Sequence, residues 1–313
     1  MIDAQHLGMQ FGPVTALQDA TFHVGQGEIL GLLGPNGAGK STIMKILTTY
    51  LRPSAGTATV CGFDVIKNPI RVREKIGYLP ENLPLYLHME VGEYLDFVAR
   101  ARGLSGTRLS ERMNWVLAKT GLLPMFHRPI AELSKGYRQR TALAQALIHD
   151  PDVIILDEPT TGLDPHQILE IRALIRELAG TKTVLFSTHI LHEVEAIADR
   201  VVIISQGAIK AQGTVDELAM KAGTRPLVRA EIKTGGPEAT EFLAGLPGVE
   251  QVQTIREDGE WTTLRISALD PGATLEQVSL LCQARNWPLR ELSLPGQSLE
   301  DIFLALTRTD NAA

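Results

Sequence analysis

The segment from residue 34 to residue 41 carries residue types that bind phosphate groups. It reads Gly34-Pro35-Asn36-Gly37-Ala38-Gly39-Lys40-Ser41 and matches the pattern GxxxxGK[ST] in full. The glycines let consecutive backbone N–H groups turn inward toward a β- and a γ-phosphate, and Lys40 adds a positive charge there. The Ser41 hydroxyl is a ligand for Mg²⁺, and Thr42 is placed to donate to the α-phosphate. Because the segment follows an expected strand and opens an expected helix, it predicts a site for a nucleoside triphosphate.

Two carboxylates, Asp157 and Glu158, follow the aliphatic run Val153–Leu156. Open α/β sheets build their sites from groups that lie at the C-terminal ends of buried strands. Taken alone, such a strand end is common and says little. Downstream of a phosphate-binding loop, it indicates that Asp157 holds Mg²⁺ through water and that Glu158 polarises an attacking water as general base.

Three further stretches carry a family resemblance. Leu133-Ser134-Lys135-Gly136-Tyr137-Arg138-Gln139-Arg140 resembles the LSGGQ signature of ABC-transporter ATPases. Gly162-Leu163-Asp164-Pro165 is similar to the D-loop of that family, and Ser187-Thr188-His189 is similar to its switch-histidine segment. The resemblance covers residues 1 to about 220, and the ordered set of motifs is highly specific. It implies an α/β P-loop NTPase (RecA-like) core that binds ATP and Mg²⁺ and hydrolyses ATP.

The resemblance also implies how these residues share one nucleotide. Two copies would meet head to tail, with Lys40 and its loop from one copy and Ser134 and Gly136 from the other on the same triphosphate. The signature precedes a helical run, so its amides and the positive end of that helix can meet the γ-phosphate. By the same resemblance, His189 contacts the γ-phosphate and holds water near Glu158, and Asp164 crosses the dimer interface. Phe11 matches the aromatic residue that stacks on adenine, although a core aromatic is the competing interpretation.

Two departures from the family pattern stand out. In Ile76-Gly77-Tyr78-Leu79-Pro80-Glu81, a glutamate replaces the usual glutamine of the Q-loop. Glu81 can still offer Mg²⁺ an oxygen, and its extra negative charge predicts a stronger dependence on Mg²⁺; the alternative is a plain ligand substitute. In the signature, Lys135 and Tyr137 replace glycine and glutamine. Lys135 either adds positive charge at the dimer interface or is simply solvated.

These residues need a scaffold of alternating strands and helices over residues 1–222. Short β-like runs are expected at Thr21–Val24, Glu28–Leu33, Val153–Leu156, Thr183–Ser187 and Val201–Ser205, with helical patterns at Ser41–Tyr50 and Ile168–Leu178. Strands that alternate with helices predict a parallel sheet. Residues from about 83 to 148 differ from this alternating pattern. They carry helical patterns (Val91–Arg102, Leu109–Thr120, Tyr137–Ile148) and little strand signal. We interpret them as a helical subdomain inserted into the core.

The C-terminal part, residues 223–313, begins with Gly223-Thr224-Arg225-Pro226, whose glycine and proline indicate a break between domains. Its predicted order is strand, helix, strand, strand, helix, strand, followed by a last helix at Leu299–Thr307. That order predicts a small ferredoxin-like α+β domain with an accessory role; the alternative is an irregular helical tail.

The bulk composition is that of an ordinary globular chain. The 313 residues are 44% hydrophobic and 21% charged, with a formal net charge of −6, which argues mildly against a nucleic-acid-binding surface. We see no secretory signal and no apolar stretch near the ~18 residues that a membrane helix needs. We therefore expect a cytoplasmic protein whose membrane contact goes through a partner.

The kind of partner follows from the resemblance. A single cassette with an LSKG-type signature and a C-terminal extension resembles the ATPase subunits of ABC-2-type exporters, as does the ending Gly296–Thr307. The Tyr-Leu-Pro-Glu form of the Q-loop resembles their gliding-motility-associated branch. The resemblance implies a separate membrane permease, and we expect it to dock around Asn82–Asp96 through Leu83, Leu85, Tyr86, Leu87 and Tyr94. The alternative is that these residues pack internally, as some of them must.

Two other functions compete with transport. A non-transport ABC ATPase acting on ribosomes or DNA is one, but ribosomal members resemble two fused cassettes, and only one phosphate loop occurs here. A regulatory nucleotide-binding module without turnover is the other, and Glu158 and His189 argue against it.

Overall fold

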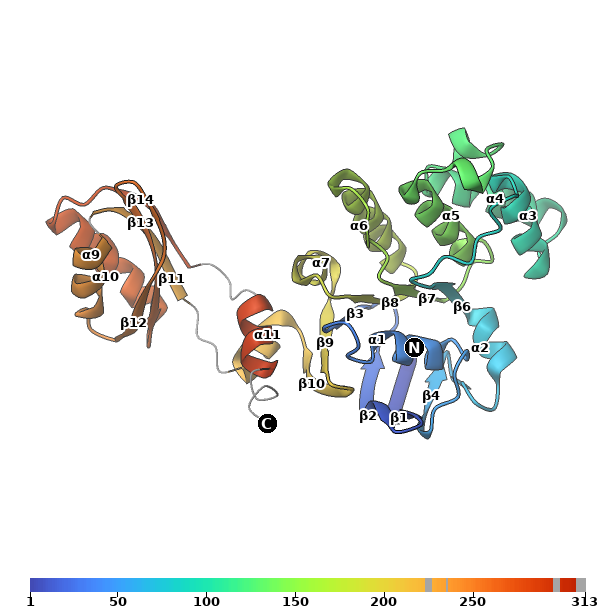
Figure 1. Cartoon of the computed structure of the whole chain (residues 1–313), viewed down its shortest axis with the longest axis horizontal. Coiled ribbons are helices and arrows are strands. Elements are labelled where there is room, and N and C mark those ends of the chain that lie inside the picture. The colour runs from blue at the N-terminus through green and yellow to red at the C-terminus, as the bar shows by residue number, and fades with distance from the viewer. Residues whose placement is uncertain (223–226, 235, 295–298, 308–313) are drawn as a thin grey trace. The chain divides into compact units, whose positions relative to one another are not determined.

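The computed structural model describes residues 1–222, 227–234, 236–294 and 299–307 (Figure 1). The chain divides into two compact units, Met1–Thr214 and Val215–Ala313. The sequence placed this boundary between residues 222 and 223, which is one helix too late. The helix in question, α8 (Val215–Lys221), packs against α11 (Leu299–Thr307) and so belongs to the second unit. The predicted domain break at 223–226 and the first residues of the exporter-like ending, 296–298, lie outside the described residues.

The larger sheet of the first unit has the strand order β10-β9-β3-β8-β7-β6. Its strands are β3 (Ile29–Leu33), β6 (Ile76–Leu79), β7 (Val153–Asp157), β8 (Thr183–Thr188), β9 (Arg200–Ser205) and β10 (Ala208–Gly213). All neighbours pair in parallel except β10, which is antiparallel to β9. Every residue of β3, β7 and β8 is buried, which explains their aliphatic sequences. The predicted parallel sheet is thus confirmed.

A second, antiparallel sheet was not predicted. Its order is β2-β1-β4-β5, and its strands are β1 (Ile2–Phe11), β2 (Val14–Val24), β4 (Ala55–Val60) and β5 (Phe63–Asp64). These strands are only half-buried, so they lack the continuous apolar runs of the parallel sheet. Of this sheet, only the end of β2 was predicted.

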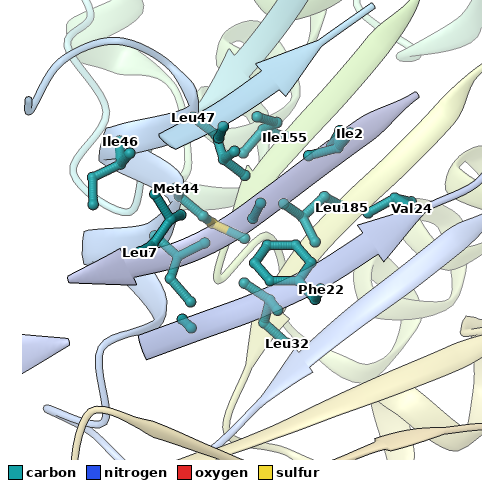
Figure 2. Packing of buried hydrophobic residues seen from close by; sticks show 14 of the residues in the cluster. Ile2, Leu7, Phe22, Val24, Leu32, Met44, Ile46, Leu47, Ile155 and Leu185 are labelled. Carbon is teal, nitrogen blue, oxygen red and sulfur yellow. The ribbon is translucent and has the colours of Figure 1, made fainter. Parts of the chain in front are cut away.

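The core of the first unit lies between the two sheets, around α1 (Lys40–Leu47). Figure 2 shows Met44 of α1 near Leu7 of β1 and Phe22 of β2, and Leu47 of α1 near Ile155 of β7, all in one apolar cluster. The helices α2 (Pro69–Lys75), α6 (Pro165–Ala179) and α7 (Leu191–Ile197) complete the α/β part. In Figure 1, α6 and α7 lie on the opposite side of the six-stranded sheet from α1. The helix that follows the phosphate-binding loop is therefore held firmly by its apolar face.

Helices occupy the chain between β6 and β7. They are α3 (Val91–Ala101), α4 (Gly106–Lys119), the 3₁₀ turns η1 (Leu123–Met125) and η2 (Ile130–Glu132), and α5 (Lys135–Leu147). Their apolar faces pack together, with Tyr94, Leu95, Val116 and Leu143 buried. Ser134 is the N-cap of α5, and its hydroxyl accepts from the Tyr137 N–H. The signature segment is thus the start of a helix.

The second unit contains a four-stranded antiparallel sheet in the order β12-β13-β11-β14. Its elements are β11 (Leu227–Lys233), α9 (Gly236–Ala244), β12 (Val249–Asp258), β13 (Trp261–Ala268), α10 (Pro271–Ala284) and β14 (Leu289–Ser293). Val228, Ile232, Leu264 and Ile266 of the sheet share a core with Leu243 of α9 and Val278 of α10. This is the strand and helix order of a ferredoxin-like fold, rather than the irregular tail.

The described residues contain no helix long and apolar enough to cross a lipid bilayer.

Gly77 of β6 gives a test of how the sheet meets the helical part. A Cβ on Gly77 would lie 2.2 Å from the Ala146 carbonyl oxygen of α5, a backbone atom that cannot move away alone. We expect Gly77→Ala to destabilise the protein by about 1–3 kcal/mol, through forced separation of β6 and α5. Chemical denaturation followed by circular dichroism measures the shift in midpoint.

Gly180→Ala is the matched control, because the nearest atom to its Cβ is a carbonyl oxygen at 3.7 Å. It is expected to leave the midpoint unchanged or to raise it slightly. Equal midpoints for the two variants would contradict the close packing of β6 on α5.

Candidate functional site

A cavity of about 450 Å³ lies where the loops after β3, β7 and β8 meet. The carboxyl ends of neighbouring parallel strands are where open α/β sheets place ligands. The cavity is lined by Ala16, Asn36, Gly37, Ala38, Gly39, Lys40, Ser41, Thr42, Glu81, Glu158, Thr161 and His189. The structure therefore brings together most of the predicted phosphate loop with Glu81, Glu158 and His189.

The loop before α1 depends on its glycines. Gly37 and Gly39 have φ values of 80° and 109°, a region that side chains rarely adopt. Gly34 faces the backbone of β9 so closely that a Cβ would lie 2.3 Å from the Ile204 carbonyl oxygen. Because α1 begins at Lys40, the amides of its first turn have no partner within the helix and lie at the cavity. The positive end of this helix favours an anion in the cavity.

Lys40 is a buried cation, with only 6% of the residue exposed. Its ammonium group donates to the carbonyl oxygens of Gly34 at 2.7 Å and Pro35 at 3.2 Å. The Lys40 nitrogen also lies 3.5 Å from Oε1 of Glu158, whose side chain is 9% exposed. Opposite charges thus face each other in a largely dry cavity, where their interaction is strong.

Asp157, at the end of β7, links the phosphate loop to β8. Its Oδ1 accepts from the Ser41 hydroxyl at 3.1 Å and from the Ser187 hydroxyl at 2.6 Å. The Ser187 hydroxyl in turn accepts from the Glu158 N–H at 3.0 Å. A serine hydroxyl and a carboxylate are oxygen ligands of the kind that Mg²⁺ prefers. Across the described ranges, no group of three or more His, Cys, Asp and Glu side chains could hold a metal by itself.

Glu158 is held by its neighbours in an unusual conformation. Its φ is 51°, in the left-handed region that is uncommon for a side-chain-bearing residue. Its Oε2 accepts from the Thr161 hydroxyl at 3.2 Å and lies 2.9 Å from Nδ1 of His189. Since a carboxylate only accepts, this contact places the proton of His189 on Nδ1 and leaves Nε2 available to the cavity. The structure thus pairs the two residues predicted to act on water.

The pKa of Tyr78 is sensitive to the negative charges at this end of the sheet. Its ring is half-buried, and burial raises the pKa of its hydroxyl well above its ordinary value. The negative charges of Asp157 and Glu81 raise this pKa further. Glu81 and Asp157 thus both lie near Tyr78, and Glu81 also lines the cavity.

The remaining predicted residues do not line this cavity. Ser134 and Asp164 are exposed N-caps of α5 and α6, and Asp164 forms a capping box with Gln167. Gly136 is buried, and a Cβ there would lie 2.4 Å from the Gln167 side chain. Phe11 is 47% exposed at the end of β1 and does not belong to the apolar core, so the competing core interpretation of this residue is wrong.

Lys135 packs within its own chain against the D-loop. A Cβ on Gly162, which has a φ of 73°, would overlap the Lys135 ammonium group. Neither of the two interpretations of Lys135 included this contact.

Three site residues were missed in the sequence. Thr161 and Ser187 hold Glu158 and Asp157, and Ala16 of β2 forms one wall of the cavity. Thr161 and Ser187 are small hydroxyl residues next to the motifs, which was the available signal. Ala16 carries no chemical signal, since only the fold brings β2 to the loop.

The family described as ABC transporter matches residues 17–161. The ABC transporter ATP-binding protein NatA of Bacillus subtilis (strain 168) is 40% identical over 207 residues, which are 66% of this chain and 84% of NatA. The daunorubicin/doxorubicin resistance ATP-binding protein DrrA of Streptomyces peucetius is 35% identical over 309 residues, covering 98% of this chain and 92% of DrrA. The Nod factor export ATP-binding protein I of Ralstonia nicotianae (strain ATCC BAA-1114 / GMI1000) is 34% identical, covering 98% and 94%.

Solved structures show the same fold. The ATP-binding subunit of an ABC transporter superimposes with a TM-score of 0.67 at 32% identity, covering 72% of this chain and 94% of that chain. The ATP-binding cassette MJ0796, in a dimeric post-hydrolysis state bound to ADP and Pi, superimposes with a TM-score of 0.64 at 23% identity, covering 69% and 99%. With its phosphate loop, paired carboxylates and switch histidine around one cavity, the chain belongs to the ABC transporter ATP-binding proteins.

Proposed function

We propose that the chain binds Mg²⁺–ATP in the cavity, closes head to tail with a second copy, and uses hydrolysis to drive a separate membrane permease of the ABC-2 exporter type. The observation that carries the proposal is that Lys40, Glu158 and His189 line the same cavity. A buried cation next to a water-polarising carboxylate suits a substrate that is anionic and is cut by water.

The residues divide the work of hydrolysis. Lys40 and the amides of the loop hold the β- and γ-phosphates, and Ser41 and Asp157, with Glu81 near them, would hold Mg²⁺. When bound, Mg²⁺ neutralises charge on the phosphate oxygens. Glu158 accepts a proton from a water whose oxygen attacks the γ-phosphorus, while the bond to the β–γ bridging oxygen breaks. With its Nδ1 proton directed at Glu158, His189 can accept a hydrogen bond from that water through Nε2, and it donates to a γ-phosphate oxygen only when the ring is doubly protonated.

The second copy supplies what this cavity lacks. Ser134 and Asp164 cap helices at exposed positions and have no place on their own chain's cavity. The first turn of α5 presents backbone amides and a positive helix end of the kind that binds phosphate. A partner turned head to tail would bring these groups to the γ-phosphate, with Asp164 at the interface.

Export is supported by the relatives that match nearly the whole chain. One is named for drug resistance and another for Nod factor export, and their matches extend over the C-terminal unit. We therefore place the protein on the cytoplasmic face of the membrane, attached through its permease, with no nucleic acid as partner. The narrower resemblance to the gliding-motility-associated branch stays a prediction.

The permease is proposed to dock beside α3. Tyr86 and Leu87 are 53% and 43% exposed, but Tyr94 is buried and its hydroxyl donates to Gln145, so its place in the predicted docking surface is wrong.

A second cavity of about 400 Å³ is lined by Thr48, Thr49, Tyr50, Arg73, Ile76, Tyr78 and Arg102. In the described parts of the chain, Arg73 and Arg102 donate only to oxygens of Thr49 and Arg73 and have no carboxylate partner. This charge favours a permease segment that carries an acidic residue.

The central test replaces the general base. Glu158→Gln keeps the size of the side chain but cannot accept the proton, so we expect turnover to fall by about 100-fold or more while Mg²⁺–ATP still binds. Light scattering of this variant with Mg²⁺–ATP is expected to show a dimer. Adding Ser134→Arg should abolish that dimer, and a dimer that persists, or wild-type turnover in Glu158→Gln, would refute the proposal.

Glu81 gives a prediction on the metal. Replacement of Glu81 by Gln removes one negative charge from the cavity lining, so less divalent cation is needed to hold the triphosphate. We expect a lower Mg²⁺ concentration at half-maximal ATP hydrolysis in Glu81→Gln. Glu74→Gln, at an exposed glutamate paired with Arg71, serves as control. An unchanged Mg²⁺ requirement would reject the special role and leave Glu81 as a plain ligand.

The docking surface is tested by charge reversal. Arg102→Glu should reduce recovery of the membrane subunit in a pull-down from native membranes by about tenfold or more, with ATP binding unchanged. Arg108→Glu, an exposed arginine on α4, is the control and should have no effect. Normal recovery with Arg102→Glu would place the docking surface elsewhere.

A further inference from the structure

Glu193 is a buried carboxylate that the proposed hydrolysis does not use. It lies in the first turn of α7, and only 2% of the residue is exposed. Within the described residues it forms no ion pair, and its recorded side-chain partners are two hydroxyl groups. Burying a charge with so little compensation is costly, so a purely structural position would more often be filled by an apolar or neutral residue.

The two partners of Glu193 belong to two different loops. Oε1 accepts from the hydroxyl of Thr160, and Oε2 accepts from the hydroxyl of Thr188 at 2.6 Å. Both threonines are buried, with exposures of 5% and 0%. Each carboxylate oxygen therefore serves a separate segment of the chain.

These segments are the ones that carry the reactive pair. Thr160 follows Glu158 by two residues, and Thr188 immediately precedes His189. Oε2 of Glu158 and Nδ1 of His189 are 2.9 Å apart. Glu193 thus closes a ring in which the distance between Glu158 and His189 is set by the distance between Thr160 and Thr188. A ring of this kind also helps to hold the left-handed φ of Glu158.

Helix capping does not explain this arrangement. A glutamate at the third position of a helix commonly reaches back to the N–H of the N-cap residue. Here, the N–H of the N-cap residue Ile190 donates to the Thr188 hydroxyl at 3.0 Å instead. The side chain of Glu193 is left to bridge the two loops.

We propose that Glu193 is a positioning residue for ATP hydrolysis, whose carboxylate holds the loops of Glu158 and His189 at the separation that the reaction needs. The proposal rests on the proposed function, since it assigns Glu193 to the same reaction. It predicts that the residue acts on turnover and not on nucleotide affinity, because its side-chain hydrogen bonds go to Thr160 and Thr188, and Glu193 is not among the residues that line the cavity.

The test compares variants of the full-length chain. Glu193→Ala removes both acceptors, and we expect kcat for ATP to fall by about 10- to 100-fold, with the Kd of a fluorescent ATP analogue changed less than about threefold. Glu193→Gln should retain more activity than Glu193→Ala, because its amide can pair with both hydroxyls once one of them turns to accept. Glu195→Ala, at an exposed residue of the same helix, is the control and should behave as wild type.

Two results would overturn the inference. One is wild-type kcat in Glu193→Ala, and the other is a parallel loss of nucleotide affinity and turnover, which indicates a general structural role. If Glu193→Ala does not fold, Thr188→Val decides, because it removes the hydroxyl that donates to Oε2; an unchanged kcat there overturns the inference. Failure of the proposed function looks different, since the wild-type chain and Glu195→Ala would then also lack Glu158-dependent turnover.

Discussion

The approach of the Lys40 ammonium group to the Glu158 carboxylate is the contact on which the rest of the site depends. The two groups are 3.5 Å apart and almost fully buried, so each is held where water screens little. The phosphate groups of a nucleotide fit this arrangement, because they offer Lys40 an anionic partner. In the proposed reaction, Lys40 serves for binding and Glu158 polarises the attacking water.

The fold is what makes this contact possible. Lys40 lies on a helix whose apolar face is held between two sheets, and Glu158 and His189 follow neighbouring strands that are buried along their whole length. Ser187 and Thr161 hydrogen-bond to the two carboxylates, and Glu193 bridges the two loops through Thr160 and Thr188. Rigid strands therefore place groups that lie far apart in the sequence, and hydroxyl groups adjust them.

The sequence predicted the residues of the site better than the strands and side chains that hold them in place. The phosphate loop, Asp157, Glu158 and His189 were predicted because their chemistry is encoded in short local patterns, and the buried strands because continuous aliphatic runs mark them. The antiparallel sheet of β1, β2 and β4 was missed, since half-buried strands leave a weak pattern. Ser187 and Glu193 could not be assigned either, because a serine and a glutamate have no distinct meaning until folding brings their partners close. Ser134, Gly136 and Asp164 acquire a role only when a second copy is considered.

An experimental structure of the Glu158→Gln chain with Mg²⁺–ATP tests the central claim most directly. We predict that the γ-phosphate lies between the Lys40 nitrogen and residue 158, that Ser41 and Asp157 are near the metal, and that Ser134 of a second copy contacts the same phosphate. A nucleotide bound away from the loop of residues 34–41, or gripped by one copy alone, would contradict the account.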